Sequence, residues 1–333
     1  MSDLIVRSMD IGFGTTKVLV GYDQNGNPQF FNFPSLAPKS ARTGAGESFG
    51  DSRDTVVVEI EGLSYEIGPD SIDLSSDAES RILHDQYVFS DQYRALFVGG
   101  LYYMDTDEID YLQLGLPFNM MHNADAVKEQ AIGTFEVGGK KITVKNAGVI
   151  EQPLGGYEYH SANAEDGDEM EDEVVLIIDP GYLTFDWVVV KNGKLVEPRS
   201  GAVQGGVSRV LSMIAKAISE TYLNGEDYNN LEAIDKALMK ETRKIRIYGQ
   251  KKELDPVLTA AVPAIDGPIN QMINRVGDMK DIDRVVLLSG GARIFRNRLT
   301  KLLHRFEIEI PPAGIFANCW GYQEKAFKLL GLK

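Results

Sequence analysis

The chain has 333 residues and a formal net charge of −15, from 34 Lys and Arg against 49 Asp and Glu. Its 43% hydrophobic and 25% charged content is that of an ordinary globular protein of about two domains, which excludes a disordered, collagen-like or disulfide-scaffold chain. The acidic balance also argues against direct nucleic-acid binding, which needs a basic face.

Cys319 is the only cysteine, so the chain can form no intrachain disulfide, as expected in a reducing cytoplasm. The first ten residues lack the apolar core of a signal peptide. Aliphatic runs such as residues 174–178 are far shorter than the roughly 20 residues of a membrane span. We therefore expect a cytoplasmic protein that does not bind membranes.

The first half of the chain reads as mixed α/β structure. Residues 4–11 and 17–22 are β-like, and Asn25-Gly26 is a hairpin signal. Short β-rich pieces follow over residues 30–72, around a polar stretch at 39–53 that predicts a mobile loop. The pattern then predicts a helix at 91–103, a buried strand at 109–115, a helix at 125–132 and a hairpin at 135–144.

The second half follows a seam at residues 161–173, where seven of 13 residues are acidic and a solvated loop is expected. A buried strand at 174–179 leads to a turn at 181–186, a strand at 187–190 and the turn Asn192-Gly193. Helices are predicted at 207–222, 231–247 and 254–276, the last interrupted at Pro263 and Pro268. A strand at 284–289 and helices at 295–306 and 322–330 complete the chain.

An internal repeat indicates the architecture. In DIGFGTT, from Asp10, and DPGYLTF, from Asp179, the aspartate is followed by Gly at +2, an aromatic residue at +3 and Thr at +5. Each copy lies between two predicted strands and is closed by an Asn-Gly turn. The copies are 169 residues apart, which predicts two duplicated α/β domains rather than a solenoid.

These turns suit phosphate binding. Gly12, Gly14 and Gly181 let backbone N–H groups approach an anion, and Lys17 adds a point charge. A single turn of this kind is more often an ordinary hairpin. Two such turns in equivalent positions of a duplicated chain predict a pair that clamps a triphosphate from opposite sides. Asp10 and Asp179 would hold a hydrated Mg²⁺. Neither the P-loop motif nor the Rossmann glycine pattern occurs.

A third motif, VVLLSGGA at residues 285–292, runs from a buried strand into paired glycines, where a flat ligand can press on backbone. Together the motifs resemble the phosphate-1, phosphate-2 and adenosine motifs of the actin/Hsp70/sugar-kinase superfamily, in order and over nearly the whole chain. The chain is most similar to the plasmid-segregation proteins of the ParM/StbA type and short archaeal relatives. The segment PPAGIFANCWGYQEKAF resembles the second connecting motif, with Asn318 and Gly321 on the interdomain helix.

The resemblance implies an actin-like, ribonuclease H-like ATPase fold, with two duplicated α/β domains around a nucleotide cleft. The domains would cover residues 1–160, with a small subdomain at about 34–76, and 174–333, with a helical subdomain at about 207–278. It also implies that Glu151, or its neighbour Gln152, positions the attacking water, with Asp10 and Asp179 as catalytic and metal-binding carboxylates. The expected nucleotide-binding residues are Gly12, Gly14, Thr15, Thr16, Lys17, Gly181, Tyr182, Thr184, Gly290, Gly291, Ala292, Lys240 and Arg243.

Some residues depart from the family pattern or have ordinary explanations. Pro180 and Leu183 differ from the usual phosphate-2 residues, and Lys240 and Arg243 equally fit a charged helix face. The four histidines show no metal-ligand spacing. Cys319 is expected to be a packed thiol.

The leading hypothesis is an ATPase, or GTPase, that polymerises head to tail with nucleotide and Mg²⁺ and segregates plasmid DNA through a DNA-binding adaptor protein. The alternatives are a small-molecule kinase and a monomeric nucleotide switch of the same superfamily.

Overall fold

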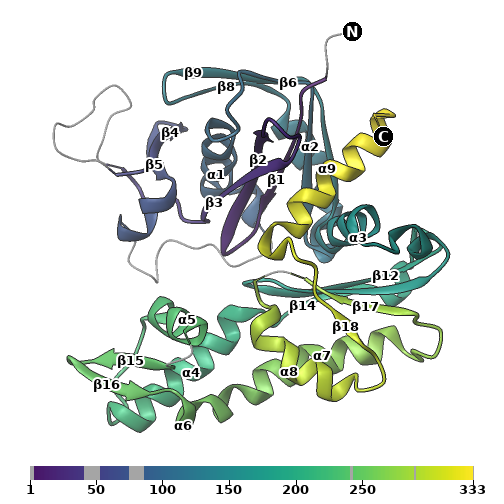
Figure 1. Ribbon diagram of the computed structural model, residues 1–333. Helices are drawn as coiled ribbons and strands as arrows, with labels where there is room; N and C mark the ends of the chain where they lie inside the picture. The colour runs from purple at the N-terminus through teal and green to yellow at the C-terminus, as the bar shows by residue number, and fades with distance from the viewer. Residues whose placement is uncertain (1–3, 41–52, 75–85, 241–242, 289, 333) are drawn as a thin grey trace.

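The computed structural model describes residues 4–40, 53–74, 86–240, 243–288 and 290–332. Two mixed β-sheets lie one above the other, and each is accompanied by its own helices (Figure 1). We call the upper half domain I and the lower half domain II. Within the described residues, no helix is long and apolar enough to cross a membrane.

The sheet of domain I has the order β10-β7-β1-β2-β3. β1 pairs antiparallel with β2 and parallel with β7, and β7 pairs parallel with β10. Its strands are β1 (Val6–Ile11), β2 (Thr15–Tyr22), β3 (Pro28–Pro34), β7 (Tyr111–Leu116) and β10 (Ala147–Glu151).

The sheet of domain II repeats this pattern. β11 pairs antiparallel with β12 and parallel with β17, which pairs parallel with β18. Its strands are β11 (Val174–Pro180), β12 (Thr184–Lys191), β13 (Lys194–Leu195), β14 (Gly201–Gln204), β17 (Arg284–Leu287) and β18 (Ile308–Glu309). The predicted duplication of an α/β unit is therefore confirmed.

The two Asn-Gly hairpin turns are also confirmed. Gly26 lies between β2 and β3 with φ 81°, and Asn192 and Gly193, with φ 51° and 67°, connect β12 to β13. Such positive φ values favour Asn and Gly. β12, however, begins at Thr184 and not at Trp187, because its pairing with β11 continues to Phe185 opposite Pro180.

The remaining elements of domain I surround its sheet. Helix α1 (Asp91–Tyr102) begins at the Ser90 N-cap and buries its apolar face, as predicted. Residues 41–52 of the predicted mobile loop lie outside the described residues. The other elements are β4 (Val56–Ile60), β5 (Leu63–Ile67), η1 (Pro69–Leu74), η2 (Tyr87–Phe89), β6 (Glu108–Ile109), η3 (Phe118–Asn123), α2 (Ala124–Ala131), β8 (Gly133–Val137) and β9 (Lys140–Val144).

The helical part of domain II differs from expectation at residues 231–247 and again at Pro268. Residues 231–247 were expected to form one helix, but α5 ends at Met239 and Lys244–Ile247 forms strand β15, paired with β16 (Gln250–Glu253). Ile245 and Ile247 are buried while Lys244 and Arg246 are exposed, which is the period of a strand.

Proline positions explain the next segment. Pro263 lies in the first turn of α7, where a missing N–H costs nothing. The predicted interruption at Pro268 is wrong, because this proline removes one backbone hydrogen bond and the helix continues past it to Val276. The helices of domain II are α4 (Val207–Tyr222), as predicted, α5 (Leu231–Met239), α6 (Asp255–Leu258), α7 (Val262–Val276) and α8 (Ala292–Leu302), with the short turns η5 (Glu197–Arg199) and η6 (Thr259–Ala261).

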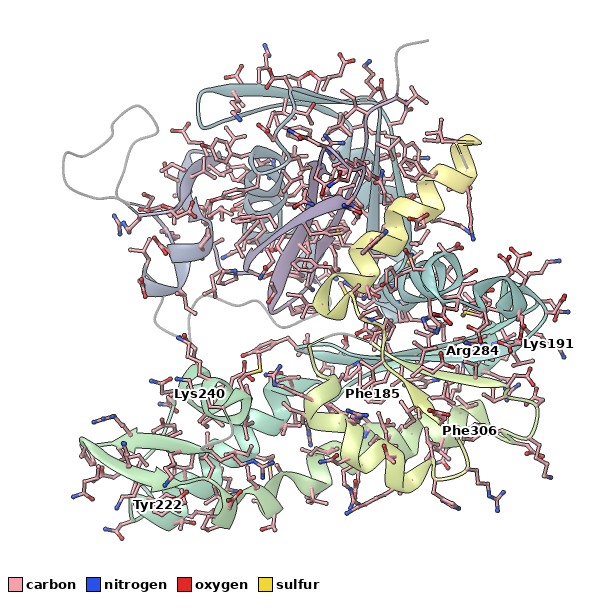
Figure 2. The ribbon with its side chains drawn as sticks, in the orientation of Figure 1. Phe185, Lys191, Tyr222, Lys240, Arg284 and Phe306 are labelled. Carbon is pink, nitrogen blue, oxygen red and sulfur yellow. The ribbon has the colours of Figure 1, made fainter. Side chains whose placement is uncertain are left out.

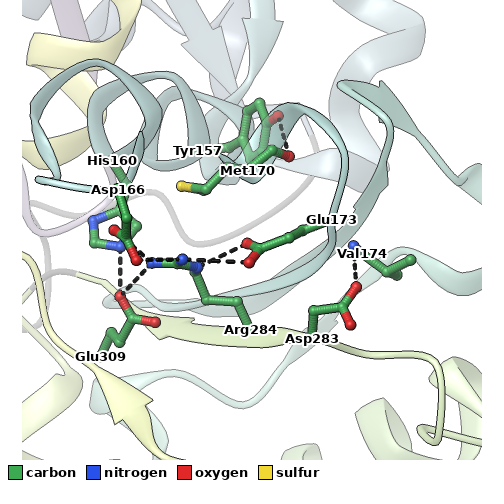
Figure 3. Close-up of polar contacts among 9 residues, drawn as sticks. All are labelled: Tyr157, His160, Asp166, Met170, Glu173, Val174, Asp283, Arg284 and Glu309. Atoms are coloured by element: carbon green, nitrogen blue, oxygen red, sulfur yellow. Dashed lines mark hydrogen bonds and ion pairs between the residues drawn. The ribbon is translucent and has the colours of Figure 1, made fainter. Parts of the chain in front are cut away.

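The acidic seam is more ordered than the expected solvated loop. Helix α3 (Gln152–Asn163) extends into it, and η4 (Gly167–Glu171) buries Met170 completely. The buried Arg284 of β17 holds this segment from below (Figure 3).

The Arg284 guanidinium contacts three carboxylates: Asp166 at 2.7 Å, Glu173 at 2.9 Å and Glu309 at 3.2 Å. Its hydrogen bond to Asp166, with the other carboxylates, raises the pKa of Arg284 despite burial. His160 shares Glu309 at 2.7 Å, so this histidine lies in an ion-pair cluster (Figure 3).

Two helices cross between the domains. Tyr157 and Tyr159 of α3 pack on the sheet of domain II. Helix α9 (Ala317–Leu330), which begins five residues before its predicted start, lies along β1 of domain I after η7 (Gly314–Phe316) (Figure 1). The crossing is tight, because a Cβ at Gly321 would overlap the Gly155 carbonyl oxygen.

Candidate functional site

The cleft between the domains lies where the two duplicated turns face each other. It encloses about 150 Å³. A Cβ on Gly14 would lie 2.8 Å from the Tyr182 Cβ, so only glycine lets the two turns approach this closely. The cleft is lined by Asp10, Gly12, Phe13, Gly14, Thr15, Lys17, Gln152, Asp179, Pro180, Gly181, Tyr182, Thr184, Val207, Asp235, Gly290, Gly291, Arg293, Ile315 and Asn318.

On the domain I side, Asp10 at the end of β1 lies directly opposite Lys17 of β2. The Lys17 ammonium is 2.9 Å from Asp10 Oδ2. Burial would lower the pKa of Lys17, but the charge and hydrogen bond of Asp10 outweigh it and raise the pKa. Lys17 is therefore held protonated at the cleft, where it can meet an anion.

On the domain II side, the residue equivalent to Lys17 is Asp186, which lies opposite Asp179. Burial, together with the charge of Asp179, raises the pKa of Asp186 to about 7. Asp186 Oδ1 accepts a hydrogen bond from the Phe118 backbone N–H of domain I, at 3.1 Å. The sequence prediction missed Asp186, although the 169-residue repeat places it at the position of Lys17.

Two side-chain amides fix the cleft aspartates. Gln152 Nε2 donates to Asp10 Oδ1 at 2.8 Å, and Asn318 Nδ2 donates to Asp179 Oδ2 at 2.6 Å. Both amides belong to the crossing helices α3 and α9. Glu151, the first residue predicted to position water, is the N-cap of α3 and is not among the cleft-lining residues, whereas its alternative Gln152 is.

Most predicted phosphate-binding residues come together here, with one exception. Thr16 is buried away from the cleft, and its Oγ1 is 2.9 Å from Ser35 Oγ. This follows from the alternation of a strand, which puts Thr15 and Lys17 on one face of β2 and Thr16 on the other.

The predicted adenosine motif contributes Gly290 and Gly291, while Ala292 is the buried first residue of α8. A Cβ on Gly291 would overlap the Pro180 carbonyl oxygen, so the third motif packs directly on the second turn. Arg293, one residue further, bonds the Gly290 carbonyl at 2.6 Å and pairs with Asp235 of α5.

Lys240 and Arg243 do not line the cleft. Lys240 ends α5 on the side of domain II opposite Arg284 (Figure 2), and Arg243 pairs with Asp255 at 3.2 Å on the surface. The α5 residue at the cleft is Asp235. Sequence reasoning missed it because the candidates were taken from the basic residues Lys240 and Arg243 near the end of the predicted helix.

The donor set is compatible with a hydrated Mg²⁺. Asp10 and Asp179 supply carboxylate oxygens beside amide groups, which suits a hard cation that keeps its waters. Among the described residues, no group of three or more His, Cys, Asp or Glu could ligate a metal directly. Cys319 is a packed thiol as predicted: burial raises its pKa to about 12.

Two family models match the sequence. The N-terminal domain of actin like proteins matches residues 8–155, and the C-terminal domain of the archaeal actin homologue MreB-like family matches residues 177–301. No curated protein matches the sequence.

Solved structures share the fold over whole chains. A ParM filament from Clostridium botulinum is 17% identical, with 98% of this chain and 99% of that chain covered and a TM-score of 0.74. Ta0583, an archaeal actin homologue in complex with ADP, is 17% identical over 98% and 100%, with a TM-score of 0.72. The apo pSK41 ParM protein is 18% identical over 99% of each chain, with a TM-score of 0.68. The two family models, one for each half of the chain, show that the chain belongs to the actin-like proteins, and the solved structures show the same fold.

Proposed function

We propose that the protein is a nucleoside triphosphatase that polymerises head to tail when it binds ATP or GTP with Mg²⁺. The observation that carries the proposal is the facing pair of glycine turns, with Lys17, Asp10 and Asp179 around one cleft. Backbone N–H groups at the turns and the Lys17 charge would hold the phosphates, which is the positioning that phosphoryl transfer requires.

The roles of the side chains follow from their contacts. Asp10 and Asp179, oriented by Gln152 and Asn318, would hold a hydrated Mg²⁺. When bound, the cation neutralises charge on the phosphates. The nucleoside would enter between α5 and α8, where Arg293 and Asp235 now pair, and Gly290 and Gly291 would support its base.

The volume of the cleft implies that the two domains move when a nucleotide binds. About 150 Å³ is below the roughly 300–1,000 Å³ of small-molecule sites, so a nucleotide must also occupy the mouth of the cleft. The two domains would adjust around it by pivoting at the crossing of α3 and α9. Through such a pivot, binding and hydrolysis of the nucleotide would change the surfaces by which neighbouring protomers contact one another in the filament.

The relatives support both nucleotide binding and assembly. Ta0583 was solved with ADP, and AlfA was solved as a filament bound to AMPPNP. A head-to-tail contact that does not close into a ring generates an open filament. We further propose that the filament works in the cytoplasm and segregates plasmid DNA. A DNA-binding adaptor would link filament and DNA, since the net charge of −15 disfavours direct DNA binding.

Glu151 and Gln152 compete for the role of positioning the attacking water. Because Gln152 contacts Asp10 and lines the cleft, Gln152→Ala should lower turnover more than Glu151→Ala at saturating nucleotide. Larger loss in Glu151→Ala would restore the first assignment.

The test of the function is light scattering of the purified protein with ATP–Mg²⁺ or GTP–Mg²⁺, alongside phosphate release. Nucleotide-dependent scattering followed by phosphate release is the expected result. Phosphate release without scattering, over a wide protein concentration range, would contradict polymerisation and favour the small-molecule kinase or monomeric switch.

A further inference from the structure

The crossing helices α3 and α9 are themselves duplicated parts of the chain. Gln152 and Asn318 are 166 residues apart, and so are Gly155 and Gly321, close to the 169 residues between Asp10 and Asp179. Both helices begin at the cleft and cross at the glycine pair. Gln152 and Asn318 are therefore equivalent residues of the two halves.

Each amide holds an aspartate of one domain, while most contacts of its helix with the two sheets lie in the other domain. Helix α3 packs on domain II, yet Gln152 bonds Asp10 of domain I. Helix α9 bonds domain I through Gln323 Nε2 and the Val6 carbonyl, yet Asn318 bonds Asp179 of domain II. The two amides therefore tie each aspartate to one of the crossing helices.

Asn318 also carries an acceptor that the protein does not satisfy. Its side chain is 5% exposed and lines the cleft, and Oδ1 has no hydrogen-bond partner among the described residues. The carboxylate of Asp179 accepts hydrogen bonds, so the amide nitrogen must face it and Oδ1 must be the free atom. A buried acceptor without a partner is costly, which points to a ligand that donates to it.

We propose that Asn318 is a second positioning residue for hydrolysis, whose Oδ1 accepts a hydrogen bond from the attacking water while Nδ2 fixes Asp179. This rests on the proposed triphosphatase function. The water oxygen bonds to the terminal phosphorus as the bond from that phosphorus to the bridging oxygen breaks. The nucleoside diphosphate leaves with the electron pair. An amide cannot take up the proton, so the water proton passes to an oxygen of the released phosphate.

The experiment compares Asn318→Ala with Gln323→Ala in the full-length chain. Gln323 is a matched control, because it is also on α9, is 1% exposed and has an orphan amide oxygen, Oε1, but does not line the cleft. Asn318→Ala should lower kcat about 100-fold, as expected when a preorganised hydrogen bond to the reacting group is removed. The Kd for a fluorescent nucleotide analogue should change less than about threefold, and the loss of kcat should persist at saturating Mg²⁺. Gln323→Ala should keep kcat within about threefold.

A double variant adds a readout that a purely structural role would not move. If Asn318 and Gln152 orient one water, the kcat losses of the two alanine variants should be less than multiplicative. Multiplicative losses would overturn the assignment to a shared water. If Asn318→Ala does not fold, Asn318→Ser, which keeps a polar side chain but cannot span both contacts, takes its place with the same expected loss.

Two results would overturn the inference while leaving the proposed function standing. One is wild-type kcat in the folded Asn318 variant. The other is a kcat that raised Mg²⁺ restores, which would assign Asn318 to the cation instead of the attacking water. Failure of the wild-type protein to release phosphate would instead refute the triphosphatase function itself.

Discussion

Replacing Gly321 by alanine tests whether the α3–α9 crossing is as tight as its geometry implies. A Cβ at this position would overlap the Gly155 carbonyl oxygen and would lie 2.8 Å from the Tyr159 backbone nitrogen. Both neighbours are backbone atoms of α3, so relief requires the helices to separate. Overpacking of this kind costs about 1–3 kcal/mol, and backbone neighbours place the cost at the upper end.

The same substitution at Gly267 is the matched control. Gly267 lies inside α7, and a Cβ there would meet nothing within 4 Å. The ring of the adjacent Pro268, however, crowds a Cβ on the preceding helical residue and offsets the helix propensity of alanine, so Gly267→Ala should be close to neutral. Gly321→Ala gains the full propensity of about 1 kcal/mol, so its net destabilisation should be about 2 kcal/mol.

Thermal unfolding checks the difference between the two variants. At about 2.1 cal/mol/K per residue the unfolding entropy of 333 residues is about 0.7 kcal/mol/K, so Gly321→Ala should lower Tm by about 3 °C, whereas Gly267→Ala should leave it within about 1 °C. Nucleotide-dependent light scattering should also fall in Gly321→Ala, because helices forced apart alter the pivot between the domains. A Tm for Gly321→Ala equal to or above that of the wild type would refute the reasoning.

Three further substitutions test the charges of the molecule. Lys17→Met removes the partner of the buried Asp10, so nucleotide affinity should fall at least about tenfold and unfolding free energy by about 3 kcal/mol; an unchanged Kd in a fluorescence titration would contradict the phosphate role. Arg284→Met removes the charged partner of Asp166 and Glu173, whereas Glu309 keeps His160, and because these carboxylates are partly exposed it should cost about 1.5–3 kcal/mol in urea unfolding; a loss below about 1 kcal/mol would show that the cluster is solvated. The pKa of Asp186 is raised to about 7 from 3.8, so the folded state holds its proton more tightly and stability should fall as pH rises from about 4 to 7. Asp186→Asn should remove this fall, by up to roughly 4 kcal/mol, and an identical pH profile in the variant would refute burial as the cause.

The sequence by itself determined the duplicated fold and most of the cleft. The repeat from Asp10 and Asp179 is visible because a strand, a glycine turn and a second strand are formed by consecutive residues. The Asn-Gly turns and helix α4 also depend on residues close together in the sequence, and both predictions are confirmed. Glu151 as the water-positioning residue remains a prediction.

Tertiary structure decided what depends on residues far apart in the chain. The bond from Asn318 to Asp179 joins residues 139 apart, and Arg284 reaches Asp166 across 118. The local pattern predicted a loop for the acidic seam, because the buried side chain of Met170 is stabilised by packing on the sheet of domain II, which the local sequence does not show. Residues 244–247 likewise form a strand only because β16 pairs with them and the core receives their two isoleucines. Long-range packing, rather than local secondary-structure propensity, therefore determined which helix face, which amide and which carboxylate line the cleft.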